Sequence, residues 1–191
     1  MPVGVGGGRE SRRCADRLSK PAKSGPYLPS GQARVVVVST HAQTVLQQAW
    51  LTCQRHWHHM QHALQALEPH LPVLGQDLTK LDDEQVQDWD QFILRFTKLQ
   101  DALGAQLYPA LLAYLQEPYE DRPMLDKLNR LEKMGYLVSV EQWQALRAIR
   151  NRLTHDYPSD DALKAAYLND AVDSVNLLKA LLDRVADVIP G

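Results

Sequence analysis

Apolar residues recur at helical spacing along most of the chain after residue 38. The first stripe alternates steps of four and three residues: Leu46, Trp50, Cys53, Trp57, Met60, Leu64 and Leu67. Because about 3.6 residues make one turn of an α-helix, these steps place the side chains on one face. The pattern predicts a long amphipathic helix that begins near residue 39 and ends at Pro69 and Pro72.

A second stripe begins after three acidic residues, Asp82 to Glu84, which suit the positive end of a helix dipole. Its members are Val86, Trp89, Phe92, Phe96, Leu99, Leu103 and Leu107. Pro109 is expected to bend or break this helix, and apolar residues continue beyond it to Leu115.

Three more helices follow the polar segment 117–123. A short helix at about 124–134 ends at Gly135, and the next is capped by Ser139 and closed by Pro158. Ser159 to Asp161 cap the last helix, whose stripe is Leu163, Tyr167, Ala171, Val175, Leu178, Leu182, Val185 and Ile189. No segment alternates with period two. The sequence predicts an all-α fold, an antiparallel four-helix up-down bundle with one short extra helix.

The formal net charge of -2 hides two unlike parts of the chain. Residues 1–35 carry seven basic against two acidic residues and six of the ten glycines. We therefore expect a disordered basic tail over residues 1–38 and one helical domain over 39–191. Two cysteines cannot form a disulfide framework, and no apolar run approaches the ~20 residues of a membrane span. These features predict a cytoplasmic protein without a membrane partner.

Candidate chemistry concentrates in residues 147–158, at the end of a core helix. Arg150 offers a planar fork of donors to phosphate oxygens, and His155 supplies an imidazole, the group that most often takes and returns a proton in catalysis. RNA carries its own nucleophile, the 2′-hydroxyl, so its cleavage needs a base, an acid and charge stabilisation, but no metal or cofactor. Asn151 is placed to orient the phosphate or the histidine. Five residues separate Arg150 from His155, about 140° round a helix, so they would meet at a frayed end or across two copies.

The segment Arg150 to Tyr157 resembles the R-x4-H-x-Y signature of HEPN-domain proteins, specifically the HepT-like RNase toxins. Asn151 also matches the polar residue that this family prefers after the arginine. The resemblance implies a homodimer in which two motifs face one another across a cleft and cleave RNA without metal. It assigns phosphate stabilisation to Arg150, acid–base catalysis to His155 and a supporting role to Asn151.

The same resemblance implies a protein partner, a small nucleotidyltransferase that acts as antitoxin. That partner would transfer AMP to Tyr157, and the added anion would occupy the phosphate site beside Arg150. Arg147 and Arg152 are possible RNA contacts, although solvated helix positions are the plainer interpretation. Two alternatives remain open: a catalytically inactive HEPN subunit that only binds the nucleotidyltransferase, and a helical adaptor whose motif is a capped helix end.

Two other groups of residues carry weaker hypotheses. The histidines at 56, 58, 59 and 62 could hold a metal, but a surface cluster is favoured because no cysteine or carboxylate stands on that face. Arg95 and Asp101 could line the catalytic cleft, but a surface ion pair between them is favoured.

Overall fold

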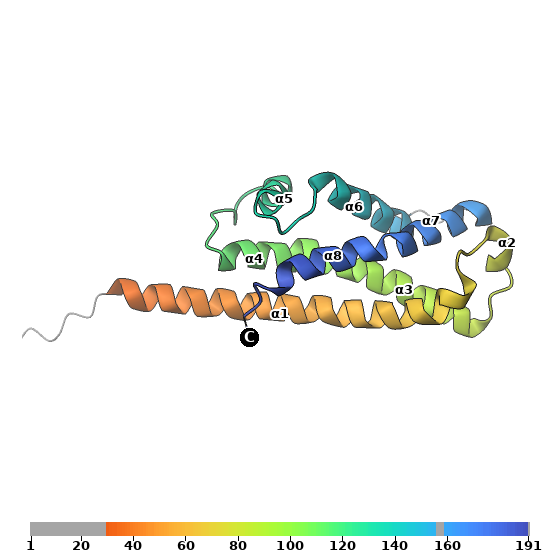
Figure 1. The fold of residues 1–191 in the computed structure, drawn as a ribbon, viewed down its shortest axis with the longest axis horizontal. Helices are drawn as coiled ribbons and strands as arrows, with labels where there is room; N and C mark the ends of the chain where they lie inside the picture. The colour runs from red at the N-terminus through yellow and green to blue at the C-terminus, as the bar shows by residue number, and fades with distance from the viewer. Residues whose placement is uncertain (1–29, 156–158, 191) are drawn as a thin grey trace, which may run out of the picture.

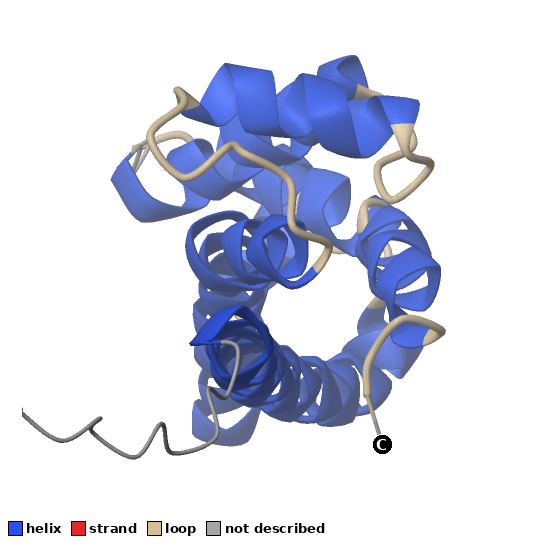
Figure 2. Cartoon of the chain, turned by 90° about the vertical axis from the view of Figure 1, so that its left-hand side faces the viewer, coloured by secondary structure: helices blue, strands red, loops and turns tan. Residues whose placement is uncertain are grey.

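All regular secondary structure is helical in the part of the chain that the computed structural model describes, residues 30–155 and 159–190 (Figures 1 and 2). The all-α prediction is confirmed, and no strand occurs in these ranges. The elements are α1 (Ser30–Leu67), the 3-10 turn η1 (Glu68–His70), α2 (Gly75–Leu78), α3 (Asp83–Ala102), the π-helical turn η2 (Leu103–Leu107), α4 (Tyr108–Tyr114), α5 (Met124–Lys133), α6 (Val140–His155), α7 (Asp161–Asp173) and α8 (Val175–Ala186).

Helices α1 and α3 lie side by side and form the base of the core (Figure 1). The first apolar stripe is buried as predicted, with Leu46, Cys53 and Met60 fully enclosed and Trp50 and Trp57 packed against them. Phe92 and Phe96 meet this stripe from α3 and are also fully buried. Removing such side chains from water supplies the main stabilisation of the pair.

Side-chain caps fix the helix ends that the sequence predicted. Asp82 and Gln85 form a reciprocal capping box at the start of α3. The Ser139 hydroxyl accepts a hydrogen bond from the Gln142 amide at 3.0 Å, and Asp160 accepts one from Ala162 at 2.8 Å. After α5, Gly135 adopts a φ of +84°, a left-handed conformation that glycine adopts without strain.

The first helix is longer than its stripe indicated. Helix α1 begins at Ser30, so the boundary expected between tail and domain at residue 38 falls within a helix. Residues 1–29, which hold the rest of the predicted tail, lie outside the described residues. At the other end of the chain, Gln47 donates a hydrogen bond to the carbonyl of Pro190 at 3.0 Å, which ties the last described residues to the middle of α1 (Figure 1).

The segment between α1 and α3 is anchored to α7. The Asn169 side chain bonds both backbone groups of Val73, accepting from its amide at 3.0 Å and donating to its carbonyl at 2.9 Å. Gly75 opens α2 against the start of α7, where an added Cβ would lie 2.7 Å from the Ala162 nitrogen. The sequence did not predict this short helix.

Pro109 does not break the second helix. Instead α3 passes into the π turn η2 and then into α4, with Pro109 in the first turn of α4. Proline lacks an N–H and its ring crowds the carbonyl four residues earlier, and the wider π turn accommodates both effects. The last predicted helix is likewise divided, into α7 and α8, at Ser174, whose hydroxyl donates to the Asp170 carbonyl at 2.7 Å.

Two positions of the predicted stripes are not in the core. Val86 is 43% exposed and Leu163 is 42% exposed, and each lies in the first turn of its helix. Within residues 30–155 and 159–190, no helix has both the length and the apolar character to cross a membrane.

Candidate functional site

Helix α6, which carries the motif, packs beside α3, and its large aromatic side chain Trp143 contacts the π turn and α4 that continue α3. Trp143 is buried and lies in ring contact with Tyr108, with centroids 5.3 Å apart. Gly104, in the π turn, lets the Trp143 ring approach the backbone so closely that an added Cβ would lie 2.9 Å from it. Leu146 and Leu153 are also buried. This packing sets how far along α3 the rest of α6 lies.

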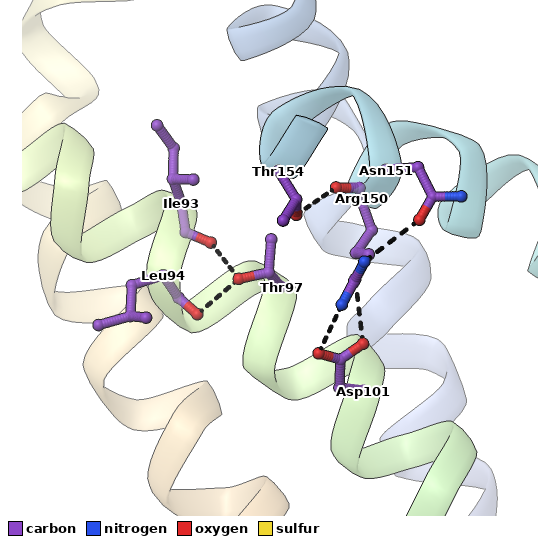
Figure 3. A network of polar contacts seen from close by, with 7 residues as sticks. All are labelled: Ile93, Leu94, Thr97, Asp101, Arg150, Asn151 and Thr154. Carbon is purple, nitrogen blue, oxygen red and sulfur yellow. Dashed lines mark hydrogen bonds and ion pairs between the residues drawn. The ribbon is translucent and has the colours of Figure 1, made fainter. Parts of the chain in front are cut away.

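Two turns after Trp143, Arg150 reaches back to α3 and binds Asp101 (Figure 3). Its Nε donates to Oδ1 at 3.0 Å and its Nη2 donates to Oδ2 at 2.9 Å. The remaining Nη1 donates to Asn151 Oδ1 at 3.3 Å. A bidentate pair of this kind fixes the plane of the guanidinium as well as its position. The Arg150 side chain is 23% exposed and that of Asp101 is 41% exposed, so the pair stands at the edge of solvent.

A hollow of about 510 Å³ opens beside this pair. Its lining combines apolar side chains with several polar and charged ones, which is the usual character of a small-ligand or nucleotide site. The lining residues that bear on the chemistry are Asp101, Trp143, Arg147, Arg150 and Asn151. The structure therefore brings three of the predicted site residues, Arg147, Arg150 and Asn151, into one concave surface.

His155 lies elsewhere. It is the last residue of α6 and is exposed, and it does not line the hollow. The helix remains regular up to that point, where the Thr154 hydroxyl donates to the Arg150 carbonyl at 2.8 Å (Figure 3). Five residues of regular helix separate the two motif side chains by about 140° of rotation. Within one copy of the chain, Arg150 and His155 thus face different directions.

The other predicted residues divide between α7 and the segment outside the described ranges. Arg152 donates to Asp170 at 2.8 Å and lies over the Tyr167 ring at 4.7 Å, so it joins α6 to α7. Its Nε is buried without a partner among the described residues. Tyr157, the expected site of AMP transfer, lies outside the described residues.

The sequence favours a surface ion pair between Asp101 and Arg95, and the structure gives Asp101 a different partner. Six residues separate these two side chains, which puts them about 120° apart on one helix. That angle already argued against their pairing. In the structure Asp101 binds Arg150, and Arg95 contacts His56 on α1 instead.

The histidines of α1 do not combine into a metal site. Among residues 30–155 and 159–190, no group of three histidine, cysteine or carboxylate side chains is arranged to hold a metal ion. His58 and His59 contact one another edge to face, with ring centroids 5.3 Å apart.

Comparison of the chain with models of known protein families, with curated proteins and with solved structures gave no match. The assignment of the site therefore depends on the residues around Arg150 and on their geometry.

Proposed function

We propose that this protein is a metal-independent endoribonuclease of the HEPN type, the toxin of a pair whose antitoxin is a nucleotidyltransferase. The observation that carries the proposal is the position of Arg150, at motif spacing from His155, in the lining of a hollow with Asn151 and Arg147. Three side chains with donors in the lining of one hollow suit a phosphodiester. We also propose that the fold is an up-down four-helix bundle. Its four main helices are α1, α3–α4, α6 and α7–α8, and α5 is the short extra helix.

The chemistry assigned to these residues follows their types. Arg150 and Arg147 stabilise the charge that develops on the phosphate during transfer. His155 removes the proton of the 2′-hydroxyl and returns one to the leaving 5′-oxygen, which gives a cyclic phosphate and a free hydroxyl. Asn151 holds the Nη1 edge of Arg150, so the guanidinium presents a fixed face to the substrate.

A homodimer is part of this proposal because one copy keeps Arg150 and His155 apart. If two α6 helices approach about a two-fold axis, Arg150 of one copy can face the partner copy's histidine across the cleft. Each dimer then holds two equivalent sites. The exposure of His155 at the end of α6 supports this arrangement, since a partner can reach it.

One observation favours the second candidate, an inactive HEPN subunit that only binds the nucleotidyltransferase. Both oxygens of Asp101 are bonded to the Arg150 guanidinium, so its charge is already compensated. A substrate phosphate must compete with this carboxylate, which lowers the gain from binding Arg150. The two candidates differ in whether the purified protein cuts RNA.

RNA cleavage in EDTA tests the main proposal. We expect wild-type protein to cut RNA, and both Arg150→Ala and His155→Ala to lose at least about 100-fold in rate. The control is His41→Ala, which removes an exposed histidine on α1 far along the chain from the motif. Cleavage that survives in both motif variants would reject the assignment, and a wild-type protein without cleavage that binds the nucleotidyltransferase would favour the inactive subunit.

Intact mass tests the modification of Tyr157. After co-expression with the nucleotidyltransferase, the mass is expected to rise by one or more AMP units and to return to the unmodified value in Tyr157→Phe. Tyr167→Phe is the control, because Tyr167 lies under Arg152 and is held in the α6–α7 contact. An adduct that persists in Tyr157→Phe would show that another residue is modified.

A further inference from the structure

Basic side chains gather where α1 and α3 lie side by side, on a surface that the motif does not use. They are Arg55, His56 and His59 from α1 and Arg95 and Lys98 from α3, and we call them the α1–α3 basic cluster. One contact joins the two helices directly: Arg95 Nη1 lies 3.3 Å from His56 Nδ1.

That contact fixes the form of His56. Arginine carries only N–H donors, so Nδ1 must accept and the ring proton must sit on Nε2. Partial burial, followed by the charges of Arg95, Lys98, Arg55 and His59, holds the pKa of His56 below its usual value. The ring is therefore neutral near pH 7 and keeps one N–H donor free of Arg95.

The cluster is not neutralised by acidic side chains. Neither Arg55, Arg95 nor Lys98 forms an ion pair with any residue in the described ranges. Desolvation lowers the pKa of His59, and the charged neighbours that lower it further are likewise all basic. By contrast, Arg130, Arg150 and Arg152 each have a carboxylate partner.

An uncompensated group of cations stands out in a chain with a net negative charge. Holding like charges together costs free energy, and a bound anion removes that cost. A polyanion gains more than a small anion, because several phosphates meet several cations and release their counterions. Arginine offers a planar fork, lysine a point charge and neutral histidine a single N–H, which together suit a flexible phosphate backbone.

The cluster also lies close to the site of the proposed chemistry. Lys98 and Asp101 are three residues apart on α3, which is about 4.5 Å along the helix axis and about 60° round it. Asp101 binds Arg150 on the side of α3 toward α6 (Figure 3). Arg95 contacts His56 on the side toward α1, so α3 carries the motif pair and the basic cluster on two different sides. A single strand that crosses α3 would contact both.

We infer that the α1–α3 basic cluster binds the sugar–phosphate backbone of single-stranded RNA and leads it across α3 toward Arg150. This inference rests on the proposed function only for the direction in which the strand runs, because binding itself needs no cleavage.

The test measures RNA binding in the His155→Ala background, so that the probe stays intact. The probe is a fluorescein-labelled single-stranded RNA of about 20 nucleotides with mixed sequence, followed by anisotropy at about 50 and about 200 mM salt. The test variant adds Arg95→Gln and Lys98→Gln. The matched control adds Arg122→Gln and Lys133→Gln instead, which removes the same charge from exposed positions beside and on α5.

We expect the cluster variant to bind at least about fivefold more weakly at the lower salt, while the control stays within about twofold. The slope of log affinity against log salt should fall in magnitude by about 1.4 if two phosphate contacts are lost. Arg95→Lys with Lys98→Arg keeps both charges and should bind like the parent. Because Arg95 is half-buried, the exposed Lys98→Glu serves as a second variant that does not disturb packing, and it should also weaken binding.

Equal affinity in the cluster and control variants, or no binding by the parent protein, would overturn the inference. The inference is also overturned if the cluster variant loses nucleotidyltransferase binding while its RNA binding is unchanged, because the cluster would then be a protein-docking surface. The two proposals fail separately. If wild type cuts RNA but the cluster variant binds normally, the cluster inference fails; if wild type does not cut but the variant binds weakly, only the catalytic proposal fails.

Discussion

Arg150 on α6 binds Asp101 on α3 through two parallel hydrogen bonds, at 3.0 Å and 2.9 Å. These residues are 49 positions apart in the chain. The pair couples the motif helix to the helix that runs through the core, and it orients the guanidinium that the proposed chemistry uses. It also gives Arg150 a carboxylate partner that any substrate phosphate has to displace or share.

A double-mutant cycle on this pair should give a measurable coupling in stability. We expect Arg150→Ala and Asp101→Ala to interact by about 1 kcal/mol, because the contact is bidentate and only partly exposed. Urea unfolding of the wild type, the single variants and the double variant measures it. The same cycle on Asp77 and Lys80, an exposed pair at 3.2 Å, should give about 0.3 kcal/mol or less. Equal couplings would show that the Arg150 pair contributes no more than a surface contact.

Mixed dimers test whether one site takes residues from two copies. Arg150→Ala and His155→Ala proteins are each expected to be inactive alone. After subunit exchange, half of the dimers contain one of each, and each of these regains one intact site if the site is shared. Cleavage should then recover to about a quarter of the wild-type rate. A mixture that stays inactive, although mass spectrometry shows that exchange has occurred, would place both residues of a site in one copy.

Adding a methyl group at Gly104 should push α6 away from α3. The new Cβ would lie 2.9 Å from the ring of buried Trp143. Alanine is a better helix former than glycine, but this close contact outweighs that gain, so we expect Gly104→Ala to cost about 1 kcal/mol of stability. Cleavage should also fall, because Arg150 lies on the displaced helix. Thermal unfolding and the RNA assay measure the two effects.

Gly135→Ala is the matched control for the glycine substitution. Nothing lies within 4 Å of a Cβ at Gly135, but its φ of +84° is strained for alanine. We expect a similar loss of about 1 kcal/mol with cleavage per folded molecule unchanged. If both variants lose cleavage in proportion to stability, the packing of Trp143 has no special effect on the site.

The partial burial and cationic surroundings of His56 should make the fold less stable in mild acid. Burial first, and then the charges of Arg95, Lys98, Arg55 and His59 that face it, hold the pKa of His56 in the folded protein below the usual value of about 6.5. Between those two pKa values the unfolded chain holds a proton that the folded protein lacks, so the free energy of unfolding falls as pH falls. Urea midpoints at pH about 7.5 and about 5.5 measure this loss, which should be smaller in His56→Gln. The control His41→Gln should lose as much unfolding free energy between these two pH values as the wild type. If His56→Gln also loses the same amount, the assignment of the effect to His56 is contradicted.

Local features of the fold were predictable from the sequence because they depend on neighbouring residues. The stripe from Leu46 to Leu67 follows from helical spacing, and the caps at Asp82 and Ser139 follow from side chains that bond amides three residues on. The motif was also local, since Arg150, Asn151 and His155 lie on one helix. Such patterns do not require knowledge of which helices meet.

Contacts between helices were not predictable in the same way. The partner of Arg150 and the approach of Trp143 to Gly104 depend on how far α6 slides along α3, which periodicity does not specify. The division of α7 from α8 at Ser174 was missed because both parts continue one apolar stripe. Likewise, α2 was missed because four residues are too few to show a period.

The spacing of the leucines before and after the π turn already indicated a wider turn. From Leu99 the buried leucines at 103, 107 and 111 advance by three successive steps of four. In a uniform α-helix each such step drifts by about 40°, so three of them would carry the stripe about 120° away from its partner helix. A turn that holds more residues removes part of this drift. Counting the steps would have predicted a wider turn near Pro109.

That wider turn divides the long helix into two segments, α3 and α4, and the length of the turn sets the rotation of one segment relative to the other. Asp101 lies on the segment before the turn, where it meets α6, and Leu111 lies on the segment after it, where α4 packs beside α1. An insertion or deletion of one residue within 103–107 would change the angle between these faces while leaving each face intact. The length of this five-residue segment therefore determines how the face that meets α6 is oriented relative to the face that meets α1. For the geometry of the site, that length is as important as the identity of any side chain in the segment.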